Sequence, residues 1–438
     1  MSNKSKLSDF ISIKHGFAFK GEFISTEENE NCLLTPGNFA IGGGFKSDKF
    51  KFYTGDVPSD YILNSDDLIV TMTDLSKDAD TLGYSALVPN IQNKQMLHNQ
   101  RIGLVIFIND ELDKEYLYFL MRSKEYRHHV VSTATGSTVK HTSPSKILSF
   151  EFDKPTLEQQ KKIAKYLLSF ENKIQLNTQT NQTLEQIAQA IFKSWFVDFD
   201  PVKAKIEALA NGGTLADAEY AAMQVISGKT DAELTQMQQT NPDAYKTLEK
   251  TAALFPSEMV ESELGEVPKG WGYCKVGDVV DRLKNPQKLK KDDISADYSV
   301  PVFEQGSNIL MGYTQVAGFE ADIENPMFIF GDHTCVTHLS TTPFSSYQNV
   351  ITLKGFNLST YWVYWAVRDK QKFQEYRRHW MEFIVKDIIV PDNKLLCDKF
   401  SERVKYFHKK IDENTKENQT LSEIRDSLLP RLLSGDLG

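Results

Sequence analysis

Two stretches of the chain carry mainly apolar residues at alternating steps of four and three. The first stretch runs from 163 to 195 and the second from 400 to 432. Sustained spacing of this kind is typical of long helices that pack along a narrow coiled-coil seam. The seam positions are Ile163, Leu167, Phe170, Ile174, Asn177, Asn181, Leu184, Ile191 and Trp195 in the first stretch, and Phe400, Val404, Phe407, Ile411, Asn414, Asn418, Leu421, Leu428 and Leu432 in the second. Ala188 and Arg425 stand at the remaining two positions and interrupt the apolar seam.

Both seams hold two asparagines at their centre. A buried polar side chain lowers stability unless its partner is also polar, so packing the two helices on each other would pair Asn with Asn. Because the asparagines are central, the pairing works for parallel and antiparallel helices alike, and the direction stays open. The alternative is two unrelated helices, each packed on its own domain.

The same region reveals an internal repeat. When the chain is shifted by 237 residues, 170–187 fall on 407–424 and ten of the eighteen positions are identical. A weaker echo relates 6–11 to 275–280 at a shift of 269. We therefore expect a pseudo-two-fold layout in which a globular unit and a helix are followed, after a linker, by a second globular unit and a second helix.

Each globular unit begins with short β-rich runs between Gly, Pro, Asn and Asp turns and has a helical stretch later, at 114–127 and 359–377. This order predicts an α+β fold, with two globular domains separated by two long helices. The expected segments are 1–156 and 269–392 for the domains, 157–200 and 393–438 for the helices, and 201–268 for an acidic helical connector.

The net charge of −9 at first argues against a nucleic-acid partner. Residues 206–268, however, contain eleven Asp or Glu and three Lys, a net charge of −8, so the rest of the chain is nearly neutral. This acidic segment reads as helical pieces broken at Gly212-Gly213, Gly228 and Asn241-Pro242. We interpret it as a solvated connector; an insertion for a protein partner is the alternative.

Catalytic motifs are absent from the sequence. It contains no phosphate-binding Gly-x-x-x-x-Gly-Lys-Ser/Thr loop, no Gly-x-Ser-x-Gly motif and no Pro-Pro-aromatic loop of an amino-methyltransferase. The run from Asp332 to His338 brings two His and one Cys together, but no second ligand pair accompanies it, so we predict neither a metal site nor catalytic residues. His333 and Thr334 fit better as loop donors to phosphate or base edges.

Basic and aromatic residues concentrate in the two globular units, as contact with DNA phosphates requires. Each cluster taken alone is more often a solvated face, but the recurrence in two repeated units favours DNA binding. The candidate DNA-contacting residues are Lys46, Lys49, Lys51, Arg122, Arg127, Thr138, Lys140, His141, Lys288, Lys290, His333, Thr334, Arg368, Arg377 and Arg378.

The expected location is the cytoplasm. No apolar run approaches the roughly 18 residues of a membrane span, and no apolar segment of a signal peptide follows the first residues. The four cysteines are far apart in the sequence, which fits a reducing compartment.

Four further segments resemble the specificity subunits of type I restriction-modification enzymes. They are Pro155 to Ala164, Ala190 to Pro201, Glu263 to Trp271 and Leu428 to Leu437. They occur in the order typical of that family and span both helices and the start of the second domain.

The resemblance implies a non-catalytic subunit that binds double-stranded DNA. Each globular domain would be a target recognition domain for one half of a bipartite sequence, and the helices would pack antiparallel as a spacer. Two modification subunits would use S-adenosylmethionine to methylate adenine N6, and restriction subunits would use ATP and Mg²⁺. The outer faces of the helices around 159–173 and 193–199 would dock the modification subunits. Recognition domains diverge so widely that the family supplies no base-contacting residue.

Two other classes of protein remain as alternatives. One is a DNA-modifying enzyme that acts alone, and the other is a scaffold whose coiled coil assembles partners without reading DNA. Methyl transfer by the isolated chain would favour the first, and unchanged DNA methylation on loss of the chain would favour the second.

Overall fold

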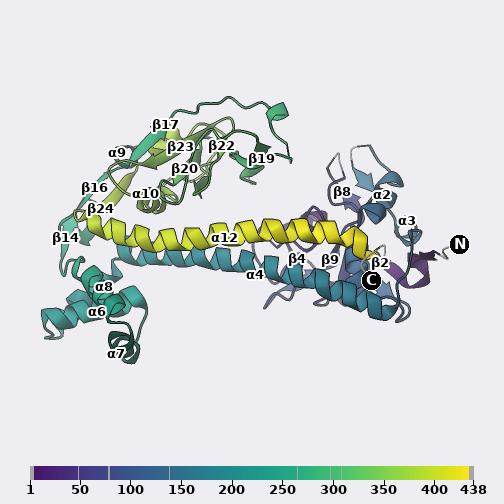
Figure 1. Ribbon diagram of the computed structural model, residues 1–438, viewed down its shortest axis with the longest axis horizontal. Coiled ribbons are helices and arrows are strands. Elements are labelled where there is room, and N and C mark those ends of the chain that lie inside the picture. Colours follow the sequence, from purple (N-terminus) through teal and green to yellow (C-terminus); the bar gives the residue numbers. More distant parts are fainter. Residues whose placement is uncertain are drawn as a thin grey trace. The chain divides into compact units, whose positions relative to one another are not determined.

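The computed structural model of the 438-residue chain describes residues 4–47, 49–76, 79–137, 139–263, 265–295, 297–306 and 308–433. The chain forms two compact units, which we call unit 1 (residues 1–176 and 417–438) and unit 2 (residues 177–416). Both contain helices and small sheets (Figure 1), so the predicted α+β class is confirmed. Each unit combines one globular part with a portion of both long helices.

The long helices are α4 (Leu157–Phe196) and α12 (Lys394–Leu433). Within unit 2, Asn414 Nδ2 donates a hydrogen bond to Asn181 Oδ1 at 2.8 Å, and the rings of Phe196 and Phe400 lie 5.5 Å apart. Later residues of α4 thus meet earlier residues of α12, so the helices run antiparallel here. The direction that the sequence left open is thereby settled for this unit.

In unit 1 the helices are also antiparallel, because Glu171 pairs with Arg425 at 3.1 Å and the earlier Ile163 shares a core with the later Leu429. All the seam positions in both units are buried or half-buried. Arg425, which interrupts the apolar seam, is held there by its ion pair with Glu171.

Each unit contains a four-stranded antiparallel sheet with the same order of strands. In unit 1 the order is β2 (Ile11–His15), β11 (Ile102–Phe107), β7 (Leu68–Thr71) and β9 (Ser85–Leu87). In unit 2 it is β17 (Val280–Leu283), β23 (Val350–Gly355), β20 (Met327–Gly331) and β21 (Thr337–Ser340). The internal repeat therefore extends from the helices to the sheets.

The weak sequence echo at 6–11 and 275–280 marks the same turn in both units. Lys6 N donates to Asp9 Oδ2 and Lys275 N donates to Asp278 Oδ2, each at 2.9 Å. The turn is followed by the first strand of the sheet in both places. Each turn is preceded by a strand of a two-stranded sheet: β1 (Ser5–Lys6) with β13 (Glu151–Phe152), and β16 (Trp271–Lys275) with β24 (Asp387–Pro391).

Smaller strands complete both units. Unit 1 adds β3 (Ile24–Ser25), β4 (Asn31–Leu33), β5 (Lys51–Tyr53), β6 (Ile62–Leu63), β8 (Thr73–Asp74), β10 (Gln95–Leu97) and β12 (Lys140–His141). Unit 2 adds β14 (Met259–Ser262), β15 (Gly265–Pro268), β18 (Val300–Phe303), β19 (Leu310–Thr314) and β22 (Ser345–Ser346).

The helical stretches predicted late in each domain are shorter than expected. In unit 1 the stretch breaks before Ser123, whose Oγ accepts from Tyr126 N at 3.2 Å and so caps a new helix. In unit 2 the helix ends at Val367, and 368–379 is non-helical. The helices are α1 (Lys114–Leu120), α2 (Lys124–Ser132) and α3 (Pro144–Leu148) in unit 1, and α9 (Val276–Val279), α10 (Thr360–Val367) and α11 (Trp380–Phe383) in unit 2.

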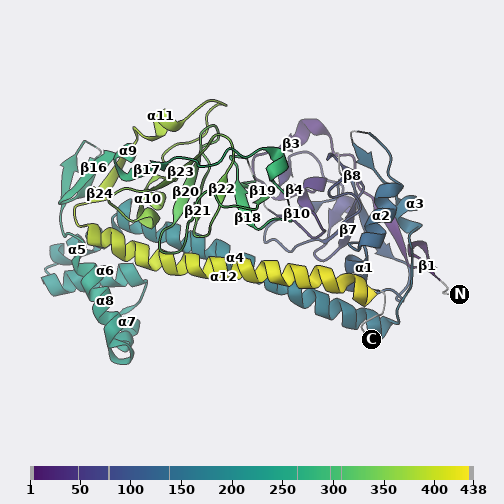
Figure 2. The ribbon, with the colours of Figure 1, turned by 45° about the horizontal axis from the view of Figure 1, so that its top comes forward.

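The acidic segment is a packed helical subdomain rather than the solvated connector we expected. Its helices, which Figure 2 shows gathered in one cluster, are α5 (Asp200–Ala210), α6 (Leu215–Ser227), α7 (Asp231–Thr240) and α8 (Pro242–Ala253). They bury Met223, Leu234 and Phe255 between them, and the ring of Phe255 lies 5.4 Å from that of Trp195 at the end of α4. Small and aliphatic residues on the inner faces supply this core, while the acidic residues point outward.

The end of α4 differs from the expectation in a second way. Phe196 is 3% and Phe199 is 6% exposed, so neither lies on an outer face of the helices. Phe199 packs edge-on against Trp271, with ring centroids 5.5 Å apart. Within the described residues, no helix is long and apolar enough to cross a membrane.

Candidate nucleic-acid interface

In unit 2 the candidate site begins where strand β20 ends. Asp332, directly after the strand, accepts hydrogen bonds at Oδ1 from the backbone amides of His379 (3.1 Å) and Trp380 (2.9 Å). The His379 amide also lies 2.7 Å from the Asp332 carbonyl oxygen. One carboxylate thus holds the segment 373–381 against the loop that follows β20.

This anchor brings together predicted residues that are far apart in the sequence. The ring of His333 lies 4.8 Å from that of Tyr376, and the Arg378 Nε lies 3.8 Å from Asp332 Oδ2. The Arg378 side chain is 78% exposed and Tyr376 is 75% exposed. An exposed cation near an exposed aromatic ring is a combination that suits phosphates and bases.

Arg377, the neighbouring candidate, is held by carboxylates of its own segment. It forms ion pairs with Glu375 and Glu382. The hydrogen bond to Glu382 is the main cause that raises the pKa of Arg377 above its usual value. Arg378 is therefore the better placed of the two to meet a phosphate.

The other predicted residues of unit 2 occupy different surroundings. The hydroxyl of Thr334 is buried, so it does not face outward. The guanidinium of Arg368 stacks over the ring of Trp365, 4.6 Å from its centroid. This group therefore packs against α10. Lys288 and Lys290 are exposed in the loop 284–290 that follows β17.

Unit 1 has an aspartate soon after the corresponding strand. Asp74 ends the short strand β8, three residues after β7, and its carboxylate accepts from Ser76 N and from Thr81 Oγ1, each at 2.7 Å. Burial alone would raise the pKa of this carboxyl, but the hydrogen bonds from Ser76 and Thr81 outweigh burial and hold the pKa below its usual value. Asp74 also pairs with Lys140 across strands β8 and β12.

Lys140 and His141 therefore lie beside the loop that follows β7, as two of the predicted contacts. His141 Nδ1 is 3.2 Å from Thr73 Oγ1. The predicted Thr138 lies outside the described residues. Lys46 and Lys49 are exposed in the chain before β5, and Lys51 is exposed at the start of that strand.

Two predicted arginines of unit 1 have partners inside the unit. The Arg122 side chain is only 4% exposed, donates to the Gly42 carbonyl at 2.7 Å and pairs with Glu171. Arg127 donates to the carbonyls of Leu82 and Ala79. These interactions use both guanidinium groups for the structure of the unit, so we remove them from the proposed DNA contacts.

The Asp332 to His338 run does not form a cluster of ligands. His338 lies against the ring of Phe303 at 4.8 Å, whereas His333 lies against Tyr376. Within the described parts of the chain, no group of three His, Cys, Asp or Glu side chains could hold a metal ion. Burial raises the pKa of the Cys335 thiol to about 11, so the thiol is protonated at neutral pH.

Sequence reasoning missed the residues that organise the site. Asp332 was part of the quoted run, but nothing in its spacing indicated that it binds the amides of 379 and 380. Tyr376 lies among the basic residues of 368–379, and this neighbourhood was the available signal. Gln305, whose Oε1 accepts from His333 N at 2.9 Å, comes from a distant loop and left no local signal.

Comparisons with known proteins agree on one family. Residues 2–186 match the model of the type I restriction modification DNA specificity domain. The type I restriction enzyme HindI specificity subunit of Haemophilus influenzae is 33% identical over 355 residues, which cover 74% of this chain and 77% of that protein. The MjaIX specificity subunit of Methanocaldococcus jannaschii is 25% identical over 366 residues, or 81% of this chain and 75% of that protein.

Among solved structures, the S subunit of a type I restriction-modification system from M. genitalium covers 98% of this chain, and the match covers 95% of that subunit. The sequence identity is 16% and the TM-score 0.49. The HsdS subunit from Thermoanaerobacter tengcongensis covers 99% of this chain and the match 97% of that subunit, at 12% identity and a TM-score of 0.31.

Proposed function

This chain belongs to the family of specificity subunits of type I restriction-modification enzymes, and we propose that each of its two globular parts reads one half of a bipartite DNA sequence. The observation that carries the proposal is the repetition of the same four-stranded sheet, with an aspartate-anchored loop after its third strand, once in each unit. Two domains that have the same sheet but different loops suit the recognition of two different half-sites.

We further propose that the chain has no catalytic activity of its own. In this proposal two modification subunits bind S-adenosylmethionine and methylate adenine N6, and restriction subunits bind ATP and Mg²⁺. Exposed apolar side chains on the outer faces of the long helices support docking of such partners. Tyr166 of α4 is 55% exposed in unit 1, and Tyr406 of α12 is 68% exposed in unit 2.

The cytoplasm is the proposed location of this complex, since its DNA target is there. All four cysteines, at 32, 274, 335 and 397, are free thiols in the structure. A reducing compartment keeps thiols in this state.

Sequencing of methylated adenines tests the proposal. Cells with the chain should carry a bipartite methylated motif that disappears when the chain is deleted. Exchange of residues 1–150 for the first domain of another family member should change one half of the motif and leave the other unchanged. A motif that survives deletion would overturn the proposal and favour a scaffold.

The isolated chain provides a second test. When it is incubated with DNA and labelled S-adenosylmethionine, we expect no methyl transfer until modification subunits are added. Transfer by the chain alone would overturn the non-catalytic role. Its DNA affinity should be weak and should fall with salt, because the chain outside the acidic segment is nearly neutral and only local clusters are basic.

A further inference from the structure

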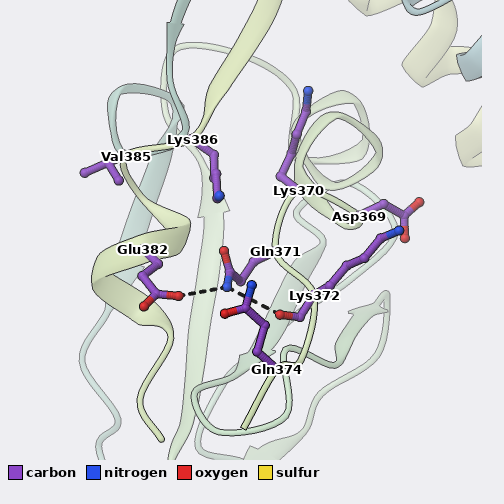
Figure 3. Close-up of a pocket in the computed structure, with 8 residues that line it drawn as sticks. All are labelled: Asp369, Lys370, Gln371, Lys372, Gln374, Glu382, Val385 and Lys386. Carbon is purple, nitrogen blue, oxygen red and sulfur yellow. Dashed lines mark hydrogen bonds between the residues drawn. The ribbon is translucent and has the colours of Figure 1, made fainter.

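Unit 2 contains a pocket of about 400 Å³ beside the segment that carries Tyr376 and Arg378. Gln371, Gln374, Glu382 and Lys386 are among the residues that line it (Figure 3). The pocket lies between the non-helical chain after α10 and the short helix α11. Lys370 and Lys372 belong to a basic cluster of the sequence, but no residue of the lining is among the predicted DNA contacts.

Gln371 is the buried polar group of this pocket, and it is only 6% exposed. Its amide Nε2 donates to Glu382 Oε2 at 3.0 Å and to the Lys372 carbonyl at 3.4 Å. Its carbonyl Oε1 is buried and has no hydrogen-bond partner among the described residues. A buried acceptor without a donor lowers stability, so such groups are uncommon in folded proteins.

The orientation of this amide follows from its neighbours. Two partners of Nε2, the Glu382 carboxylate and the Lys372 carbonyl, accept hydrogen bonds and cannot donate. The third partner is Nδ1 of His379 at 3.4 Å, whose role depends on the tautomer of the ring. The hydrogen bonds from His379 and Arg377 keep the pKa of Glu382 below its usual value, so Glu382 is charged at neutral pH. Turning the amide over would set Oε1 against that charge. The NH₂ side must therefore face Glu382, and the oxygen has no hydrogen-bond partner among the described residues.

The pocket thus offers one buried acceptor together with positive charge. In Figure 3 the carboxamide oxygen of Gln371 points toward the side chain of Lys386, away from Glu382. The charged residues that line the pocket are mainly basic: three lysines (Lys370, Lys372 and Lys386) against two acidic residues (Asp369 and Glu382). A fitting ligand has a hydrogen-bond donor for the oxygen and an anion for the lysines, and a nucleotide with an amino-bearing base has both.

We propose that Gln371 Oε1 accepts a hydrogen bond from the exocyclic amino group of a nucleobase in the half-site read by unit 2. This inference rests on the proposed function and names one specificity-determining residue for it. The donor is N6 of adenine or N4 of cytosine in the major groove, or N2 of guanine in the minor groove. A base without that amino group leaves the oxygen unpaired and is rejected.

The test removes single exocyclic amino groups from the bases of the DNA. Bipartite target DNA is prepared with purine for adenine, inosine for guanine or a 4-deamino pyrimidine for cytosine, one position of the half-site at a time. Affinity is measured for the full chain assembled with its modification subunits. At one position, loss of the amino group should weaken binding about tenfold in the unaltered complex and have almost no effect in the Gln371→Leu complex.

Two variants separate this role from a structural one. Gln374→Leu makes the same change at an exposed amide of the same pocket and should keep the tenfold discrimination. Gln371→Lys retains a donor for Glu382 and for the Lys372 carbonyl but has no acceptor. It should keep the thermal unfolding temperature of the parent and still lose the discrimination.

The outcomes are distinct. If the amino group at every position matters equally in the unaltered and Gln371→Leu complexes, the inference is overturned while the proposed function stands. The same holds if Gln374→Leu loses the discrimination as Gln371→Leu does. If the unaltered complex shows no preference for a bipartite sequence, the proposed function itself fails, and this inference fails with it.

Discussion

Each unit has its own four-stranded sheet with the same strand order, but the aspartate that follows the third strand in that order binds a different segment in each unit. The anchor of unit 1, Asp74, binds the amide of Ser76, only two residues later in the chain. The anchor of unit 2, Asp332, binds the amides of His379 and Trp380, 47 and 48 residues later. In unit 1 the aspartate fixes residues that are close to it in the sequence, whereas in unit 2 it fixes a segment that is distant in the sequence. The same sheet can therefore carry unrelated surface residues.

The arginines of the two units differ in the same sense. Arg122 of unit 1 is buried against Glu171, while Arg378 of unit 2 is largely exposed. Arginines from similar basic clusters thus have different roles. In unit 1 the Arg122 guanidinium connects the globular part to helix α4, and in unit 2 the Arg378 guanidinium faces outward, where a partner can bind.

The largest effect should come from the buried charge of unit 1. Glu171→Ala leaves Arg122 and Arg425 without their shared carboxylate and should lower the free energy of unfolding by about 4 kcal/mol. Denaturant unfolding measures this change. The control is Lys173→Ala, which breaks the exposed pair with Glu417 and should cost less than about 1 kcal/mol. Equal losses in the two variants would show that the ion pair is not a structural tie.

The second largest loss of stability should come from replacing Asp332, the anchor of unit 2. Asp332→Ala removes the carboxylate that both amides contact. The Trp380 amide then has no acceptor, while the His379 amide keeps the carbonyl oxygen of residue 332, and the free energy of unfolding should fall by about 3 kcal/mol. The methylated motif should lose the half read by unit 2 and keep the other half. Asp332→Asn retains an acceptor oxygen and should have a milder effect on both measurements. Loss of both half-sites at once would contradict independent reading by the two units.

Acid should affect unit 2 more than unit 1. Burial lowers the pKa of His338 and His408 in unit 2, and of His98 in unit 1, to about 4. Between this value and the ordinary pKa of 6.5 the unfolded chain binds more protons, so stability falls as the pH drops. At pH 5 each histidine should cost about 2 kcal/mol.

Hydrogen exchange at pH 7 and pH 5, corrected for intrinsic rates, measures this difference between the units. The protection of the unit 2 sheet should fall by about twice as many kcal/mol as that of the unit 1 sheet. His408→Leu should remove much of the excess. An equal loss in both units would refute the assignment to these histidines.

The smallest effect concerns the asparagine pair. Asn181→Leu leaves Asn414 without the partner that accepts its hydrogen bond at 2.8 Å and should cost about 1 to 2 kcal/mol. Adding Asn414→Leu should recover much of that loss, because two apolar groups then face each other. Additive losses in this double-mutant cycle would refute the pairing.

The sequence predicted those features whose signal is periodic or repeated. The seam residues, the paired asparagines and the α+β class follow from spacing and from self-similarity of the chain. The burial of Arg122 could not be predicted, because it depends on Glu171 and on the Gly42 carbonyl, both distant in sequence. The packing of α5 to α8 was missed, because acidic outer faces hid an inner face of small and aliphatic residues such as Ala222 and Met223.

The sharing of both long helices between the units has a consequence for the time course of synthesis. The seam of α4 is complete once Phe196 has been made, but its partner surface is complete only at Leu433. At the usual 5 to 20 residues per second, the intervening stretch of about 240 residues takes roughly 10 to 50 s to translate. During that interval α4 displays an apolar stripe to the cell. We therefore expect the nascent chain to depend on chaperones until α12 emerges from the ribosome.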